Sequence, residues 1–186
     1  NYKGQGTPLG IEGGLLGLEM TDDRMKNTEL VANELGISIH YEINSFKTNH
    51  VNTFRLLLEG INGKNIQVVA ISIGGGSFEI QNIDGFEVKI CGDFYELLLF
   101  NSAKEMALEE LQVMLPQSNS IVESFNNDKR LINIKFSKEV SDETIEKLQG
   151  ALNFQEFIIT KPVLPIVAGN ESELPFTSVA SLLEFA

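Results

Sequence analysis

The sequence contains a single cysteine, Cys91, no tryptophan and only 5 prolines among its 186 residues. One cysteine excludes an intrachain disulfide, and it cannot supply the three or four thiolates that hold most iron–sulfur clusters. A chain without disulfides fits a reducing compartment, so we expect a cytoplasmic protein. With few prolines and 42% hydrophobic residues, the chain is expected to fold around packed cores.

Basic residues are also scarce, because 14 lysines and arginines face 26 acidic residues and leave a net charge of −12. This charge repels the phosphates of nucleic acids and the anionic headgroups of lipids. No apolar run approaches the roughly 20 residues that a membrane-spanning helix requires. We therefore expect a soluble protein with neither a nucleic acid nor a membrane as partner.

Glycine-rich and capping residues predict two helices near the start of the chain. The run from Thr7 to Leu18 alternates leucine and isoleucine with several glycines, which predicts a short helix with close backbone packing. Thr21-Asp22-Asp23 contains residues favoured at helix starts, and Gly36 is favoured just after a helix ends. A second helix is therefore expected between these signals.

Antiparallel strands are expected to follow. Apolar side chains alternate with polar ones from Ile37 to Ile43, which is typical of a half-buried strand. Asn62-Gly63 and Asp84-Gly85 are dipeptides that favour tight hairpin turns. Around these turns the expected strands are Thr53–Ile61, Ile66–Ile73, Ser77–Ile83 and Phe86–Cys91.

The order of elements changes after Gly92. The periodicities predict strand, helix, two strands, helix and strand over Tyr95–Phe100, Ala103–Leu115, Ser120–Phe125, Leu131–Phe136, Ser141–Leu152 and Phe154–Thr160. This βαββαβ order is ferredoxin-like, so the fold class expected for the whole chain is α+β. We expect domains at 1–92 and 93–162, then a tether from Val163 and a helix, starting near Thr177, that is incomplete at Ala186.

Three loops could bind a small anion: Gly4–Thr7, Thr48–Thr53 and Ser72–Ser77. Glycine lets backbone N–H groups approach a ligand closely, and a helix that starts at Thr7 adds a favourable dipole. A carboxylate or a phosphate would suit such donors. The alternative is that the glycines form only a helix cap and a bulged hairpin connection.

Two side chains could supply positive charge to these loops. His50 lies in a polar loop that enters a strand, where a ring nitrogen can donate to a carboxylate. Arg55 shares a strand face with Thr53 and could bind a carboxylate through two hydrogen bonds, although a solvent-facing arginine is an equal alternative. No nucleophile and base, no carboxylate pair and no metal-ligand spacing emerges from the sequence, so neither catalytic nor metal-binding residues are predicted.

Six motifs in a fixed order give a resemblance to a known family. They are Gly4-Gln5-Gly6-Thr7, Gly13-Gly14-Leu15-Leu16-Gly17, Asp22-Asp23-Arg24, His50-Val51-Asn52-Thr53, Ser72-Ile73-Gly74-Gly75-Gly76 and Ile83-Asp84-Gly85-Phe86. Together they resemble the β-chain or β-domain of bacterial iron–sulfur L-serine dehydratases, in which this segment is an allosteric substrate-binding domain. A similar domain occurs in some phosphoglycerate dehydrogenases.

The sequence departs from the family pattern at three positions, with Gln5, Pro8 and Val51 where the family has His, Asp and usually Pro. Residues 95–160 resemble a divergent ACT domain, which implies dimer formation. Asn101-Ser102-Ala103-Lys104 replaces the usual Asp-x-Pro-Gly turn, so pairing is a safer role for this domain than amino-acid binding. The stretch from Pro175 to Ala186 resembles the start of the family's catalytic α-domain.

The resemblance implies a regulatory, non-catalytic region of an enzyme that converts L-serine to pyruvate and ammonia. A [4Fe–4S] cluster is implied in the catalytic domain, which belongs to the same chain or to a partner, and no cofactor is implied in this chain. The alternatives are a free-standing β-subunit, a sensing and dimerisation module, or the regulatory tail of a phosphoglycerate dehydrogenase. The residues expected to bind L-serine or a similar amino acid are Gly6, Thr7, His50, Asn52, Thr53, Arg55, Ser72, Gly74, Gly75 and Gly76.

Overall fold

The computed structural model describes residues 6–19, 21–44, 48–101 and 106–163. The chain divides into two compact units, Asn1–Lys47 and Thr48–Ala186, and each is considered by itself. Residue 92, where the sequence predicts a domain boundary, lies inside the second unit, and that boundary remains a prediction. The expected tether after Val163 and the expected helix near Thr177 lie outside the described residues, as do Gly4 and Gln5.

The first unit contains α1 (Thr7–Leu15), a 3-10 helix η2 (Asp23–Asn27) and α2 (Thr28–Glu34). Both predicted helical regions are confirmed, but the second one is divided. Asn27 leaves the helical conformation at φ −145°, and its side chain accepts a hydrogen bond from the N–H of Leu30, which starts α2. Gly36, at φ 68°, ends this helix in the left-handed conformation that favours glycine.

The predicted strand over Ile37–Ile43 is wrong, because the structure assigns no strand there. The segment is extended, and Ile37, Ile39 and Tyr41 line the same cavity as residues of α1 and α2. Ile37 and Tyr41 are still 38% and 39% exposed and Ile39 is half-buried, so these side chains lie beside helices without forming the buried face of a strand. Ile43, which continues the pattern, is 83% exposed.

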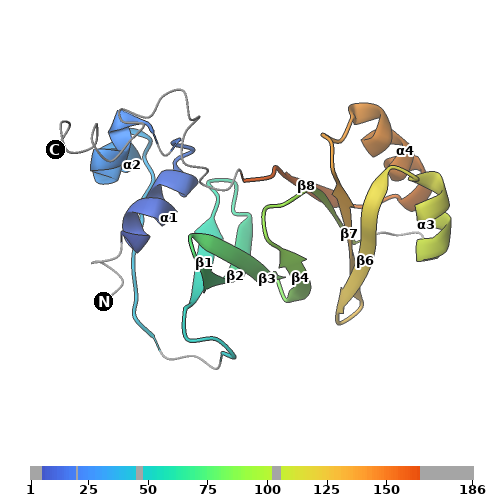
Figure 1. Ribbon diagram of the computed structural model, residues 1–186, viewed down its shortest axis with the longest axis horizontal. Coiled ribbons are helices and arrows are strands. Elements are labelled where there is room, and N and C mark those ends of the chain that lie inside the picture. Colours follow the sequence, from blue (N-terminus) through green and yellow to red (C-terminus); the bar gives the residue numbers. More distant parts are fainter. Residues whose placement is uncertain (1–5, 20, 45–47, 102–105, 164–186) are drawn as a thin grey trace, which may run out of the picture. The chain divides into compact units, whose positions relative to one another are not determined.

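The second unit begins with an antiparallel sheet in the order β1-β2-β3-β4 (Figure 1). Its strands are β1 (Thr53–Glu59), β2 (Asn65–Gly74), β3 (Ser77–Ile83) and β4 (Phe86–Ile90). The hairpin turns predicted at Asn62-Gly63 and Asp84-Gly85 are confirmed. Gly63, Asp84 and Gly85 have φ values of 76°, 50° and 87°, the positive values that tight hairpins require.

The second half of this unit follows the predicted βαββαβ order. Its elements are β5 (Tyr95–Phe100), α3 (Leu108–Met114), β6 (Ser118–Asn126), β7 (Lys129–Phe136), α4 (Asp142–Leu152) and β8 (Glu156–Thr160). The strands form an antiparallel sheet in the order β6-β7-β5-β8, which is the ferredoxin-like arrangement. The expected α+β class is confirmed.

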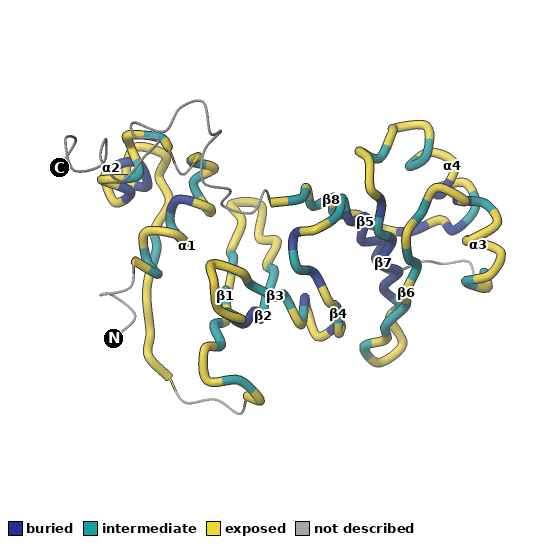
Figure 2. The backbone as a smooth tube through the Cα atoms, in the orientation of Figure 1, coloured by how far each residue is buried: buried dark blue, intermediate teal, exposed yellow. Residues whose placement is uncertain are grey.

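Strand β5 is buried on both faces, which explains its nearly continuous apolar sequence (Figure 2). Leu97 and Leu99 pack into a cluster with residues of α3 and α4. Leu98 and Phe100 instead pack against residues of the first sheet, including Phe86. Because full burial of one leucine stabilises a fold by roughly 1.5–3 kcal/mol, this strand joins two cores and makes a large contribution to stability.

Polar contacts also join the two sheets of the second unit. The Nδ2 of Asn126 donates to the carbonyl oxygen of Asp84 at 2.8 Å. Lys64, beside the β1–β2 turn, forms an ion pair with Glu156 of β8 at 2.7 Å. These contacts, with the shared apolar cluster, fix the packing of one sheet on the other.

A buried carboxylate lies among the apolar residues of β5. Glu96 is fully buried, and its Oε2 accepts a hydrogen bond from Nδ2 of Asn133 at 3.0 Å. Its Oε1 lies 3.3 Å from Nζ of Lys135, close enough for an ion pair although the hydrogen-bond geometry is poor. Nζ of Lys135 also donates to the carbonyl oxygen of Lys89 at 2.7 Å, so the same ammonium contacts both sheets.

Candidate functional site

The loop before β1 is held by hydrogen bonds among its own residues. The backbone N–H of Asn52 donates to Nδ1 of His50 at 3.2 Å. A neutral imidazole with Nδ1 as acceptor carries its proton on Nε2, so Nε2 is the ring nitrogen that can donate to a ligand. The Oγ1 of Thr53 donates to the carbonyl oxygen of His50 at 2.5 Å and lies 2.6 Å from Oγ1 of Thr48.

Two of the three predicted loops are neighbours in the second unit. The backbone N–H of Ser72 donates to the carbonyl oxygen of Asn52 at 3.0 Å. Thr53 is the register partner of Ile71, the residue before Ser72. The end of β2 and the start of β1 therefore place Asn52, Thr53 and Ser72 together, with half-buried His50 directly before them.

The three glycines at the β2–β3 connection all have positive φ values, 91° at Gly74, 61° at Gly75 and 78° at Gly76. A register shift between Ser72 and Gly74 marks a bulge, as the alternative interpretation of this loop anticipated. A Cβ at Gly74 or Gly75 would meet no atom within 4 Å, so the loop has open space beside its backbone. A bulged connection leaves room for a ligand. The anion-binding role of these glycines stays a prediction.

Arg55 is exposed on β1 and shares a strand face with Thr53, as alternation along a strand requires. Gly6 and Thr7 belong to the other unit, where Gly6 has φ 71° and Thr7 begins α1. The carbonyl oxygen of Gly6 accepts a hydrogen bond from the N–H of Gly10 at 3.1 Å. The convergence of Gly6 and Thr7 with the His50 loop therefore stays a prediction.

Cys91 does not provide the chemistry of a metal cluster. Its Sγ lies 3.7 Å from Oε2 of Glu79. Burial raises the pKa of its thiol, and the negative charges of Glu79 and Asp93 raise that pKa further. Over the part of the chain that the structure describes, no three histidine, cysteine, aspartate or glutamate side chains gather as metal ligands. One protonated thiol does not fit the ligand set of an iron–sulfur cluster.

Comparison with known proteins gives the family. The L-serine dehydratase beta chain of Peptoniphilus asaccharolyticus is 30% identical over 166 residues, which span 87% of this chain and 75% of that protein. The chain belongs to the family of L-serine dehydratase beta chains. The probable L-serine dehydratase beta chain of Bacillus subtilis (strain 168) is 34% identical over 103 residues, 55% of this chain and 46% of that protein. No family model matches the chain.

Membership of the L-serine dehydratase beta-chain family confirms the resemblance that the six motifs indicated. It does not favour the alternative of a phosphoglycerate dehydrogenase tail. Among the described residues, every helix is too short or too polar to cross a membrane.

Sequence reasoning missed two polar groups in this beta chain. One is the buried group formed by Glu96, Asn133 and Lys135. The only feature of the sequence that points to this group is a single charged residue inside the apolar run of β5. The other is Glu12, whose carboxylate accepts hydrogen bonds from Thr28 and Tyr41. No spacing rule connects these three residues, because they come from α1, α2 and the extended segment after it.

Proposed function

We propose that the chain is the regulatory, non-catalytic region of a cytoplasmic L-serine dehydratase, an enzyme that converts L-serine to pyruvate and ammonia. The observation that carries this proposal is the match of 87% of the chain to the beta chain from P. asaccharolyticus. The single cysteine supports both the non-catalytic role and the reducing compartment.

The catalytic part of the enzyme lies in another region of the same polypeptide or in a partner chain. We propose that this part holds a [4Fe–4S] cluster, which when bound there acts as a Lewis acid on the serine hydroxyl. The 186-residue chain is then expected to produce no pyruvate from L-serine and to take up no stoichiometric cluster. Anaerobic reconstitution with iron and sulfide, followed by a pyruvate assay, tests both expectations, and a cluster with activity would refute them.

The proposed role of the chain is to sense L-serine or a similar amino acid at the loops around His50 and Ser72. Nε2 of His50 donates a hydrogen bond to the ligand carboxylate, and the guanidinium of Arg55 supplies positive charge to it. Asn52, Thr53 and Ser72 orient it, and the bulged glycine loop Gly74–Gly76 leaves space beside it.

Calorimetric titration of the chain with L-serine tests this pocket. His50→Ala should weaken binding by about 1–3 kcal/mol, which corresponds to roughly 5- to 150-fold in Kd. Asn49→Ala is the matched control, because Asn49 is an exposed residue of the same loop to which the proposal assigns no contact. Absence of heat with the unmodified chain, or equal affinities of the two variants, would reject the pocket.

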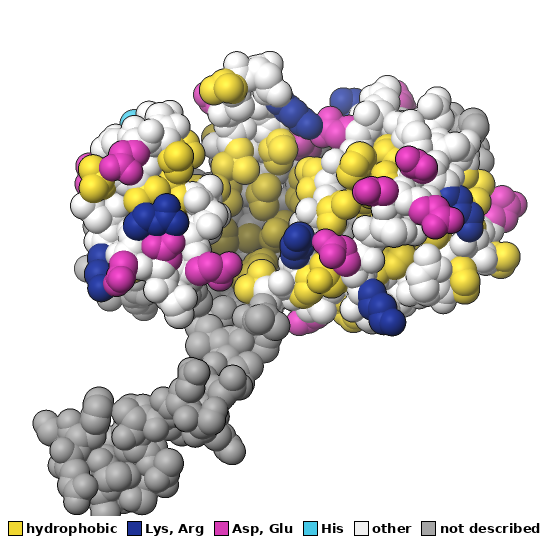
Figure 3. Space-filling view, turned by 90° about the horizontal axis from the view of Figure 1, so that it is seen from above, with side chains coloured by type: hydrophobic (Ala, Val, Ile, Leu, Met, Phe, Trp, Pro, Cys, Tyr) yellow, Lys and Arg dark blue, Asp and Glu magenta, His cyan; other side chains and the backbone are white. Residues whose placement is uncertain are grey.

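We also propose that the chain forms a two-fold homodimer through its ferredoxin-like half. Both edge strands of that sheet carry exposed apolar side chains, Val122 and Phe125 on β6 and Phe157 and Ile159 on β8. Figure 3 shows exposed hydrophobic side chains lying among charged ones on one face of the molecule. Sedimentation equilibrium should give about twice the chain mass of 20.6 kDa, whereas a mass of 20.6 kDa at all concentrations would contradict the dimer.

A further inference from the structure

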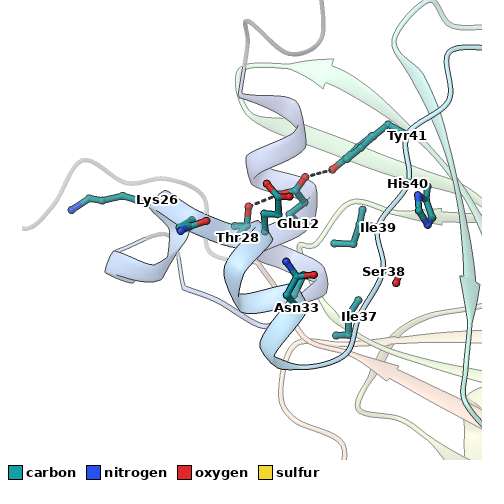
Figure 4. A pocket seen from close by; sticks show the side chains of 12 residues that line it. Glu12, Lys26, Thr28, Asn33, Ile37, Ser38, Ile39, His40 and Tyr41 are labelled. Carbon is teal, nitrogen blue, oxygen red and sulfur yellow. Dashed lines mark hydrogen bonds between the residues drawn. The ribbon is translucent and has the colours of Figure 1, made fainter.

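The first unit contains a cavity of about 510 Å³ between α1, η2, α2 and the extended segment 37–41 (Figure 4). Pockets for small molecules have volumes of roughly 300–1,000 Å³, so the space suffices for an amino acid or a small amine. Ala32, Ile37 and Ile39 give the cavity an apolar side. Glu12, Thr28 and Asn33 give it polar groups.

The carboxylate of Glu12 is fixed in this cavity by two hydroxyl groups. Thr28, which is only 4% exposed, donates through Oγ1 to Oε2 of Glu12. The hydroxyl of Tyr41 lies 3.0 Å from Oε1 of Glu12 and 3.3 Å from the carbonyl oxygen of Pro8. The shorter contact is also the charge-assisted one, so the Tyr41 proton belongs to the bond with Glu12. Hydroxyl groups from α2 and from the extended segment thus hold the carboxylate on α1 in one orientation.

The charge of Glu12 has no neutralising partner in the described part of the chain. Lys26 is the only lysine or arginine among the described residues that line the cavity, and it forms an ion pair with Asp23 at 2.7 Å. Figure 4 shows the Lys26 side chain extending away from Glu12. No other lysine, arginine or histidine of the described residues forms an ion pair with Glu12. An ionised carboxylate has about four acceptor positions, and the two hydroxyls use only two of them.

We propose that this cavity binds a small primary ammonium group, the protonated amine of an amino acid or a simple amine, with Glu12 as its counter-ion. An ammonium carries three N–H donors, which match the remaining acceptor positions of Glu12 and the carboxamide oxygen of Asn33. A divalent cation fits less well, because calcium requires six to eight oxygen ligands and both hydroxyls already donate to Glu12. The cavity shares no lining residue with the proposed carboxylate pocket at His50, and this inference does not depend on that pocket.

Ethanolamine is a suitable probe, because it has the ammonium group and lacks a carboxylate. In a ¹H–¹⁵N titration of the full chain it should shift the amide resonances of Thr28, Ala32 and Ile39 in a saturable way. Propionate, which lacks the ammonium, should leave the same resonances in place. If ethanolamine produces no saturable shift of these three amides, the site does not exist as proposed.

Glu12→Gln tests the counter-ion, since glutamine keeps the shape and one acceptor oxygen but removes the charge. Ethanolamine should bind at least tenfold more weakly to this variant. Glu19→Gln, which neutralises an exposed acid after α1 that does not line the cavity, should bind ethanolamine like the unmodified chain. Equal binding by the Glu12 and Glu19 variants would overturn the proposal.

Asn33→Ala provides a second test that does not disturb the Glu12 hydrogen bonds, because Asn33 is an exposed residue that lines the cavity. It should weaken ethanolamine binding severalfold, and unchanged affinity would remove Asn33 from the site. His50→Ala should not change ethanolamine binding at all. A loss of L-serine binding in His50→Ala with unchanged ethanolamine binding would separate the two sites, and either site can fail alone.

Discussion

Gly85 lies directly against the side chain of Asn126, where the β3–β4 turn of the first sheet contacts the β6–β7 turn of the second. A Cβ on Gly85 would overlap Nδ2 of Asn126, the same atom that donates to the carbonyl oxygen of Asp84. The backbone of Gly85 also has φ 87°, which favours glycine. Position 85 therefore needs glycine for its conformation and for its contact with the second sheet.

Gly85→Ala should destabilise the second unit by about 2–4 kcal/mol, because backbone strain at positive φ adds to the overlap with Asn126. Gly63→Ala is the matched control: Gly63 also ends a hairpin turn, at φ 76°, but its added Cβ would meet no atom within 4 Å. That variant should lose only about 1 kcal/mol. Urea unfolding of both variants measures the difference, and equal losses would show that the contact with Asn126 has no energetic weight.

Lys135→Met should destabilise the fold by about 3 kcal/mol or more, because it leaves the fully buried carboxylate of Glu96 without its cation. The double variant Glu96→Gln with Lys135→Met should recover most of this loss, since neither charge then remains. Lys161→Met removes an exposed pair with Glu139 and should change the free energy of unfolding by no more than about 1 kcal/mol. Denaturant unfolding of the three variants distinguishes a buried pair from an exposed one.

The carboxyl group of Asp22 should titrate at unusually low pH. Hydrogen bonds from the side chain and the backbone N–H of Arg24 lower its pKa from 3.8 to about 2. Because the folded-state pKa is depressed, the stabilisation is present above pH 3.8 and is lost as the pH falls towards 2. In an NMR titration, Arg24→Gln should return the pKa towards its ordinary value, whereas Lys26→Gln, which removes the partner of Asp23, should not.

Cys91 should react slowly with thiol reagents at neutral pH. Burial, Glu79 and Asp93 raise its pKa, and the thiolate is the reactive form. Its reaction with a disulfide reagent should be slower than that of a free thiol and should accelerate in Glu79→Gln. Asp128→Gln, at an exposed turn distant in sequence, serves as the control and should leave the rate unchanged. A fast reaction in the folded, unmodified chain would contradict the raised pKa of the half-buried Cys91 thiol.

Local patterns predicted the hairpins and the ferredoxin-like order well. Asp84, Gly85 and Gly63 adopt positive φ values, and both dipeptides connect antiparallel strands. Ser141 accepts a hydrogen bond from the N–H of Thr144 at 3.3 Å, as expected of the residue that caps α4. These features depend on residues close in sequence, so a single chain is sufficient to predict them.

Features that depend on distant partners escaped prediction. The alternation from Ile37 to Ile43 predicted a half-buried strand, but nothing in it shows that the segment lies beside helices or that Ile43 is 83% exposed. Glu96 belongs to an apolar run, and its partners Asn133 and Lys135 lie on another strand. The residues of the candidate site also differ in how far the sequence could predict their positions. Asn52 and Ser72 meet through the register of two neighbouring strands, whereas Gly6 belongs to the other unit.

After β8 the chain crosses back to the junction between the two sheets, where the N–H of Val163 donates to the carbonyl oxygen of Gly92 at 2.9 Å. Gly92 is buried, and an added Cβ would lie 3.3 Å from Cβ of Val163 and 3.6 Å from the ring of Phe78. This hydrogen bond ties the segment after β8 to the connection between β4 and β5. A force applied to the polypeptide beyond Val163 would therefore reach Gly92 before β8. It would be shared by β4 and β5 instead of separating the edge strand β8 from its sheet.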